Sequence, residues 1–234
     1  MSLLNTIRKG KRQLPPRVLA YGPGGIGLST FAAEAPNPIF LATENGIACD
    51  SFPTCENFEE IISCLKSLKN EENEYRTVVI DTIDWVERLF LSEVRKLQET
   101  DTVTKSDGGF GQNDDLTLLY WRQMADALNS LRDEKEMTVV LLAREKLENP
   151  SGTKQFSSLE LRRPTAAFWC EWCDVVLHAT FKFATASSGN DSTVLLRDTT
   201  TKCNIKNRYN IPETLPFRWS SLSEHFAPMD NPSH

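Results

Sequence analysis

The sequence lacks any apolar run that approaches the roughly 20 consecutive residues needed to cross a bilayer. Its charged fraction of 25% is typical of a soluble globular protein. Residues 1–16, MSLLNTIRKGKRQLPP, contain only a short apolar start before a basic polar stretch, so they do not have the pattern of a secretory signal. We therefore expect a cytoplasmic protein with no membrane partner.

Closely spaced metal ligands are also scarce. The chain has 6 cysteines and 3 histidines, and its closest cysteine pair is Cys170 and Cys173. A structural zinc site normally needs a second pair or suitably placed histidines, so none is predicted. Without a secretion signal, reduced thiols are expected rather than a disulfide framework. At a spacing of three residues, the pair would share one face of a helix as small apolar side chains.

Positive charge is not in excess, because 26 Lys and Arg face 32 Asp and Glu, for a net charge of −6. Any contact with nucleic acid must therefore use local patches. One basic group lies before the first predicted strand and another lies late in the chain. The first contains Arg8, Lys9, Lys11, Arg12 and Arg17, and the second Lys154, Arg162 and Arg163. Either group is equally compatible with an ordinary solvated face.

What the sequence does contain is an alternation of short apolar runs with helical patterns. Strands are predicted at 17–21, 39–43, 77–81 and 137–143, and helices at 31–35, 56–69, 85–98 and 116–135. Strands that are apolar throughout are typical of a sheet covered on both faces. We therefore predict an α/β fold with a mainly parallel central sheet and helices on both faces.

Later segments complete this prediction. Residues 174–198 contain two strand-like runs around a turn at 188–191, which predicts a C-terminal β-hairpin extending the sheet. The polar segments 100–114 and 148–159 are expected to be loops and candidate partner surfaces. We expect one domain over residues 1–234, with 1–16 as a basic leader and 220–234 as a flexible tail.

A glycine-rich loop, GPGGIGLST, follows the first predicted strand and runs into a helical stretch. The Walker A pattern uses glycines to present backbone N–H groups to phosphate, a lysine for the β and γ phosphates and a hydroxyl for magnesium. Leu28 occupies the position of that lysine. The predicted nucleotide-binding residues are Gly22, Pro23, Gly24, Gly25, Ile26, Gly27, Leu28, Ser29 and Thr30. The alternative is a glycine turn that only joins a strand to a helix.

Charged side chains at three other places suit the same chemistry. Asp81 ends the apolar run TVVID and suits the Walker B position, where it would bind magnesium together with Ser29. Glu44 follows the second strand and could act as a general base. Lys206 and Arg208 could present positive charge to a γ-phosphate, including that of an adjacent subunit. The alternative is that the two acids are exposed carboxylates after strands and that the two basic residues are an ordinary exposed pair.

Taken together, these motifs resemble the phage-encoded RecA-like nucleotide-binding proteins used in recombination and single-strand annealing, often grouped as a phage AAA-type P-loop ATPase domain. The matching stretches are VLAYGPGGIGLSTFAAEAPNPIFLATENG, TVVIDTIDWVE, GGFGQNDD followed by WRQMADALNSLRDEKEMTVVLLA, EWCDVVLHA and IKNRYNIPETLPFRW. They cover most of the chain and occur in the family's order. The resemblance implies a RecA-like P-loop fold.

The resemblance also implies site residues and partners. Glu44 falls on the family's catalytic glutamate, Asp81 on its Walker B aspartate, and Arg144 on a polar sensor that is usually glutamine or histidine. Lys206 and Arg208 fall on a basic finger that reaches across a subunit interface, so a ring or filament is implied. Lys154, Arg162 and Arg163 fall on or beside a DNA-binding loop. The implied cofactors are ATP and Mg²⁺, the implied partners are single-stranded DNA and a single-strand-binding protein, and the implied compartment is a host cytoplasm.

Leu28 is the main departure from the family pattern. A hydrocarbon side chain cannot make the charge-assisted contact of a lysine, worth about 1.5–3 kcal/mol, so we expect weakened binding and impaired ATP hydrolysis. Three hypotheses follow. The first is an ATP-binding recombination protein that assembles on single-stranded DNA. The second is a RecA-like scaffold that does not hydrolyse ATP, and the third is a nucleotide-dependent switch that binds a protein.

Overall fold

The computed structural model describes residues 14–42, 49–100, 111–148, 156–181, 192–195 and 206–226. The strands are β1 (Arg17–Gly22), β2 (Pro38–Ala42), β3 (Thr77–Asp81), β4 (Thr138–Glu148), β5 (Phe156–Leu159), β6 (Val175–Phe181), β7 (Ser192–Leu195), β8 (Lys206–Asn207) and β9 (Thr214–Pro216). The helices are α1 (Leu28–Ala33), α2 (Phe58–Asn70), α3 (Ile83–Thr100), α4 (Gly111–Glu134), α5 (Arg163–Trp172) and α6 (Trp219–Ser223).

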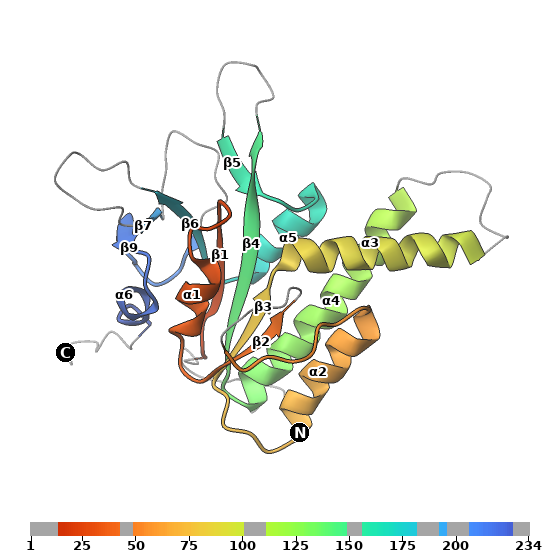
Figure 1. Ribbon diagram of the computed structural model, residues 1–234, viewed down its shortest axis with the longest axis horizontal. Coiled ribbons are helices and arrows are strands. Elements are labelled where there is room, and N and C mark those ends of the chain that lie inside the picture. The colour runs from red at the N-terminus through yellow and green to blue at the C-terminus, as the bar shows by residue number, and fades with distance from the viewer. Residues whose placement is uncertain are drawn as a thin grey trace, which may run out of the picture.

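The sheet has a parallel centre with an antiparallel extension. Its strands follow the order β2-β3-β4-β1-β6-β7-β9, while β5 pairs with β4 and β8 with β6 (Figure 1). The five strands from β2 to β6 in that order are parallel, and β7 pairs antiparallel with β6. Both the predicted parallel sheet and the predicted C-terminal hairpin are confirmed.

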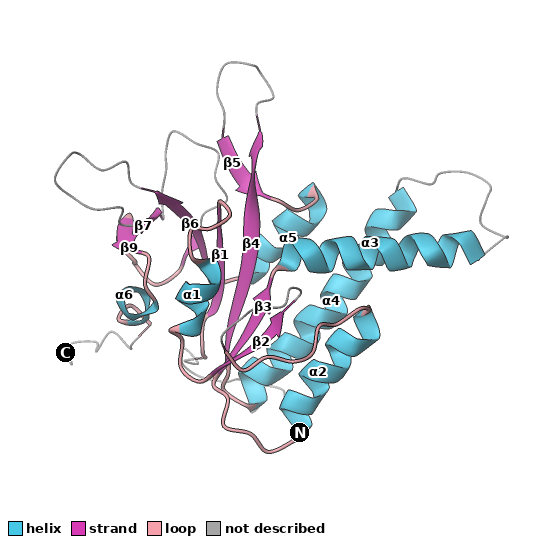
Figure 2. Ribbon diagram, in the orientation of Figure 1, coloured by secondary structure: helices cyan, strands magenta, loops and turns pink. Residues whose placement is uncertain are grey.

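Helices cover both faces of the sheet, as the apolar strands predict. Successive side chains of a strand point to opposite faces, so Leu19 and Tyr21 join one core cluster while Val18 and Ala20 join the other. The first cluster lies beneath α2, α3, α4 and α5, and the second beneath α1 and α6 (Figure 2). The predicted α/β arrangement is therefore correct.

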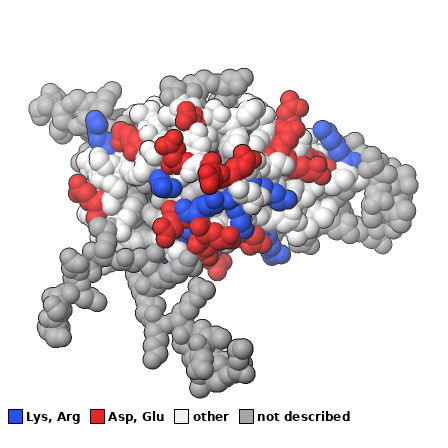
Figure 3. Space-filling view, turned by 90° about the horizontal axis from the view of Figure 1, so that it is seen from below, with Lys and Arg blue, Asp and Glu red and all other residues white. Residues whose placement is uncertain are grey.

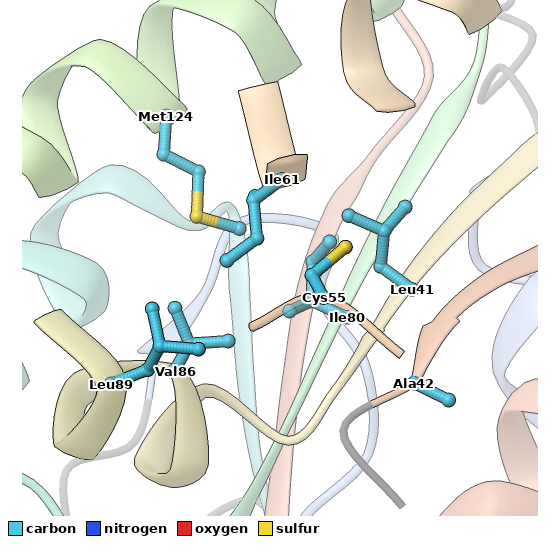
Figure 4. A pocket seen from close by; sticks show the side chains of 8 residues that line it. All are labelled: Leu41, Ala42, Cys55, Ile61, Ile80, Val86, Leu89 and Met124. Carbon is cyan, nitrogen blue, oxygen red and sulfur yellow. The ribbon is translucent and has the colours of Figure 1, made fainter. Parts of the chain in front are cut away.

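A small apolar cavity remains in the first cluster. Its volume is about 10 Å³, which is at the lower limit for a single water molecule. Figure 4 shows the side chains that line it, and they come from the sheet, the helices and the segment before α2. They are Leu41, Ala42, Cys55, Ile61, Ile80, Val86, Leu89 and Met124. The cavity has no polar lining side chain apart from a thiol, so it belongs to the core.

Parts of both segments predicted as loops belong to helices or strands. Within 148–159, residues 156–159 form β5, which pairs antiparallel with the end of β4 from Glu145↔Leu159 to Glu148↔Phe156. Within 100–114, α3 continues to Thr100 and α4 begins at Gly111. The remaining parts, 149–155 and 101–110, lie outside the described residues.

The first residues of the segment expected as a tail, 220–226, belong to the folded structure. The short helix α6 buries Trp219 and Leu222 in the cluster beneath α1, and the Trp219 ring packs against Phe31 at a centroid distance of 5.5 Å. Residues through 226 are therefore part of the folded structure, whereas 227–234 and the leader residues 1–13 lie outside the described part. Among the described helices, none is both long enough and apolar enough to cross a lipid bilayer.

Candidate functional site

The loop that joins β1 to α1 requires glycine at three positions, for two different reasons. Gly25 and Gly27 have φ values of 79° and 99°, in the left-handed region that side chains disfavour. At Gly22 a Cβ atom would lie 2.6 Å from the backbone oxygen of Ala179 on β6. Two main-chain hydrogen bonds stabilise the loop. The Ile26 amide donates to the Pro23 oxygen at 3.3 Å, and the Phe31 amide donates to the Gly27 oxygen at 2.9 Å.

The hydroxyl of this loop meets the carboxylate that ends β3. Ser29 Oγ donates a hydrogen bond to Asp81 Oδ2 at 2.6 Å. Val79 belongs to the core cluster under α1, so the two-residue period of a strand places Asp81 on that same face. The structure thus brings together the two oxygen-bearing side chains predicted for magnesium, although they are 52 residues apart in the chain.

These residues fit a magnesium-bound nucleotide in their donor chemistry. Glycines leave the loop without side chains that would block backbone amides from a phosphate, and Ser29 with Asp81 offers the hard oxygen ligands that Mg²⁺ prefers. No group of three or more His, Cys, Asp or Glu side chains placed to hold a metal occurs in the described part of the chain. Magnesium in nucleotide sites is commonly held by only one or two protein side chains plus phosphates and water.

Leu28 is a packing residue at the first position of α1. Its side chain is partly buried and contacts the core cluster that contains Phe31. The apolar side chain is therefore accommodated by the fold beside the loop. It brings neither a hydrogen-bond donor nor a charge to the place where the Walker pattern has lysine.

Arg144 lies directly beside the beginning of the loop. In the parallel pairing of β1 with β4, Arg144 is opposite Gly22. Val140 and Leu142 point toward α1, and the same alternation puts the Arg144 side chain on that face. Its amide donates to Asp84 Oδ1 at 3.0 Å, which fixes the backbone at this position.

Lys206 and Arg208 lie at the opposite edge of the sheet. The strand β8 pairs with the start of β6, so this pair is at the amino edge, whereas Gly22 is at the carboxyl edge. Lys206 Nζ donates to the main-chain oxygens of Cys170, at 3.2 Å, and Glu171. Figure 3 views the molecule from this edge and shows Lys and Arg side chains gathered near its centre with acidic side chains around them. The pair is therefore remote from the phosphate loop of its own chain.

The other predicted residues are only partly placed. Arg163 is exposed at the start of α5, and the preceding Arg162 is partly buried, with its amide donating to Glu87 Oε2 at 2.9 Å. Glu44 and Lys154 lie outside the described residues. The structure therefore brings Ser29, Asp81 and the flanking Arg144 backbone to one edge of the sheet.

Sequence reasoning missed two buried carboxylates in the first turns of α3. Asp84 and Glu87 are 2% and 4% exposed, and they accept hydrogen bonds from the amides of Arg144 and Arg162. Burial raises the pKa of Glu87, and this outweighs the lowering effects of Thr165 and Arg162. The signal in the sequence was the spacing of three residues between Asp84 and Glu87, which places both acids on the buried side of an otherwise amphipathic helix.

A second missed pair lies on the other face of the sheet near the loop. His178 Nε2 is 2.7 Å from Glu145 Oε2, and the His178 ring stacks on Tyr21 at a centroid distance of 4.8 Å. These residues come from the strands on either side of β1 and from β1 itself. The pair crosses the end of β1 just below Gly22 and so supports the base of the loop.

The fold and this geometry define an α/β P-loop domain, with a glycine loop between the first strand and helix and a Ser29–Asp81 contact beneath it. The AAA domain family matches residues 14–209, and the chain belongs to that family. The expected AAA-type P-loop class is thereby confirmed, alongside the α/β fold with a mainly parallel sheet.

Among solved structures, the chain is similar to a crystal structure of the RadB recombinase. The two chains share 14% sequence identity, 86% of each chain is covered, and the TM-score is 0.48. Comparison with curated proteins gave no match.

Proposed function

We propose that this chain is an ATP-binding RecA-like protein that acts on single-stranded DNA in recombination or strand annealing, with impaired turnover. The observation that supports it best is the 2.6 Å contact between Ser29 Oγ and Asp81 Oδ2 beneath a glycine loop. A hydroxyl and a carboxylate held together at this place are the protein ligands expected for a nucleotide's magnesium ion. The recombination role follows from the motif resemblance.

In this proposal the chain's residues have separate tasks. Amides of the loop from Gly22 to Thr30 hold phosphate oxygens, while Ser29 and Asp81 hold Mg²⁺, which neutralises charge on the phosphates when bound. Glu44 is the general base that orients a water molecule. Arg144, beside Gly22, is the polar sensor of the bound nucleotide.

The position of Lys206 and Arg208 restricts how they contribute. Because they lie at the amino edge of the sheet, they act on a phosphate only across an interface with another copy of the chain. Self-assembly into a ring or filament is therefore part of the proposal. DNA is contacted by Lys154, Arg162 and Arg163, of which Arg163 is exposed in the structure.

A second function is favoured by the packing of Leu28. Because its side chain contacts the core cluster under α1, the loop is built around an apolar residue and lacks the lysine charge. This observation supports a RecA-like scaffold that has lost turnover and binds DNA or a protein independently of nucleotide. A nucleotide-dependent switch that binds a protein and not DNA is the remaining alternative.

The test compares the unsubstituted chain with Leu28→Lys in nucleotide binding and in ATP turnover with single-stranded DNA present. Restoring a charge-assisted contact worth about 1.5–3 kcal/mol should tighten ATP binding by about 10- to 100-fold. Turnover should rise as well, since the lysine stabilises charge on the transferred phosphoryl group. Leu28→Met is the matched control, because it keeps an apolar side chain and should change neither quantity.

Binding to labelled single-stranded DNA is measured in the same samples with and without ATP and Mg²⁺. ATP-stimulated binding that weakens steeply with salt is expected for the recombination protein. Equal DNA binding with and without nucleotide favours the scaffold. No DNA binding under any condition, or equal turnover of all three proteins, contradicts the leading proposal.

A further inference from the structure

Two cysteines that are separate in the sequence lie in contact at the start of α2. The Sγ atoms of Cys55 and Cys64 are 3.8 Å apart and share a hydrogen bond. Cys55 is in the segment before the helix, and Cys64 is in its second turn. The distance needs to close by only about 2 Å to reach the length of a disulfide bond.

A hydrogen-bonded helix cap fixes this arrangement. Asn57 Oδ1 accepts a hydrogen bond from the Glu60 amide at 2.9 Å, and Glu60 Oε2 accepts one from the Glu56 amide at 2.8 Å. Reciprocal bonds of this kind define where a helix begins and how the chain enters it. The cap therefore holds Cys55 over the helix face that carries Cys64, and the two thiols do not meet by chance fluctuation of a long loop.

A surface groove reaches Cys55, one member of the pair. It has a volume of about 400 Å³ and lies between the segment that contains Cys55 and the outer side of α3. Its walls are Thr54, Cys55, Glu56, Trp85, Arg88, Leu89, Ser92, Glu93 and Lys96. Cys55 itself is 8% exposed, and Cys64 is partly exposed. The groove falls in the size range of small-molecule sites and is large enough to admit a small thiol reagent.

We propose that Cys55 and Cys64 form a modification site that a small organic disulfide, such as oxidised glutathione, converts into an intramolecular disulfide. One protein thiolate attacks a sulfur of the reagent, forming a mixed disulfide and releasing one thiol. The second protein thiolate then attacks the protein sulfur of that mixed disulfide and releases the other thiol. The protein loses two electrons and two protons, and the reagent becomes two thiols.

Burial makes this reaction slow at neutral pH. Burial, together with the neighbouring Cys64, raises the pKa of Cys55 to about 12, and burial also raises the pKa of Cys64. Because only the thiolate attacks, the rate should increase about tenfold for each unit of pH between 7 and 9. The pair is thus a slow site whose state follows sustained changes in the thiol–disulfide balance.

The experiment treats the full chain with oxidised glutathione, blocks the remaining thiols and cleaves the protein after glutamate. Cys49 and Cys55 then fall on the fragment 45–56, and Cys64 falls on 61–71. These two fragments should be recovered as one disulfide-linked species with a mass lower by two hydrogens than the sum of the separate fragments. The oxidised protein should also melt about 5 °C higher, since the bond closes a ring of roughly ten residues.

Single variants distinguish the pair from its neighbours. Cys49→Ser should leave the linked species unchanged, while Cys55→Ser and Cys64→Ser should each abolish it and leave a glutathione adduct on the remaining thiol. Cys170→Ser serves as a control at the other cysteine pair and should have no effect. A link that survives Cys55→Ser, or adducts without any link in the natural chain, contradicts the proposal. The result does not depend on nucleotide or DNA binding.

Discussion

Single glycines of the phosphate loop are constrained to different degrees, and this difference can be measured. Gly22 lies where β1 passes close to β6, so the backbone of Ala179 occupies the space a side chain would need. Gly24 has no atom within 4 Å of its potential Cβ position and no left-handed φ. The Walker pattern requires the first of these and is indifferent to the second, which agrees with the local sterics.

Gly22→Ala should therefore destabilise the protein by about 1–3 kcal/mol, because the contact is with backbone that cannot rotate away. Gly24→Ala should change the free energy of unfolding by less than about 0.5 kcal/mol. Urea denaturation of the two variants and the natural chain measures both values. Equal effects at the two positions would show that the close approach of β1 to β6 is not as described.

At the residue scale the sequence predicted those contacts that follow from strand ends. Asp81 was identified because parallel strands end at one edge of a sheet, and Ser29 because it has a fixed place after a glycine loop. The position of Lys206 and Arg208 could not be predicted in this way. It depends on β8 pairing antiparallel with the start of β6, a contact that local patterns do not encode.

At the scale of elements, the beginning of α3 connects the loop region to the hairpin of β4 and β5. Asp84 accepts from the amide of Arg144, Glu87 from that of Arg162, and Arg88 pairs with Glu160 at 2.5 Å. These three bonds hold both ends of the hairpin to the helix that follows Asp81. The hairpin that leads to residues 149–155 is therefore anchored next to the Ser29–Asp81 contact.

Glu87 makes this anchor sensitive to pH. Because burial raises its pKa, the folded state binds the proton more tightly than the unfolded state does. The contribution of Glu87 to stability is fully present below the ordinary glutamate pKa of about 4.3 and is lost as pH rises through the folded value. Glu87→Gln should therefore gain stability relative to the natural chain over this interval.

Equilibrium unfolding measured from pH 4 to pH 8 tests this expectation. Glu87→Met, which also removes the acceptor for the Arg162 amide, should be less stable than Glu87→Gln by about 1 kcal/mol at every pH. A difference between Glu87→Gln and the natural chain that is constant over the whole range would rule out the burial effect.

The hairpin itself shows why some elements were missed from the sequence. The paired segments are EKLE and FSSL, and they are largely polar because this part of β4 extends beyond the helices that cover the sheet (Figure 2). The segment 148–159 lacks the regular spacing of apolar residues that predicts a strand, so it was interpreted as a loop. The central strands were predicted correctly because burial on both faces makes them apolar throughout.

At the scale of the whole molecule, one buried carboxylate connects segments from both ends of the chain. Asp174, just before β6, pairs with Arg17 on β1 at 3.0 Å, Arg132 on α4 at 3.3 Å and Arg208 after β8 at 2.9 Å. Arg17 also lies over the ring of Trp172, 4.6 Å from its centroid. Burial favours the protonated acid, but the hydrogen bonds and charges of Arg17 and Arg132 outweigh it and lower the pKa of Asp174.

Asp174→Asn should cost about 3–5 kcal/mol at pH 7, because it leaves Arg17 and Arg132, both largely buried, without their counter-charge. The lowered pKa means that the stabilisation by Asp174 is present above the ordinary aspartate value of about 3.9 and is lost as pH falls through the folded value. The gap between variant and natural chain should therefore close in acid. Lys69→Met breaks the exposed Lys69–Glu134 pair and should cost less than about 1 kcal/mol. If the two substitutions cost the same, Asp174 does not join the two ends of the chain energetically.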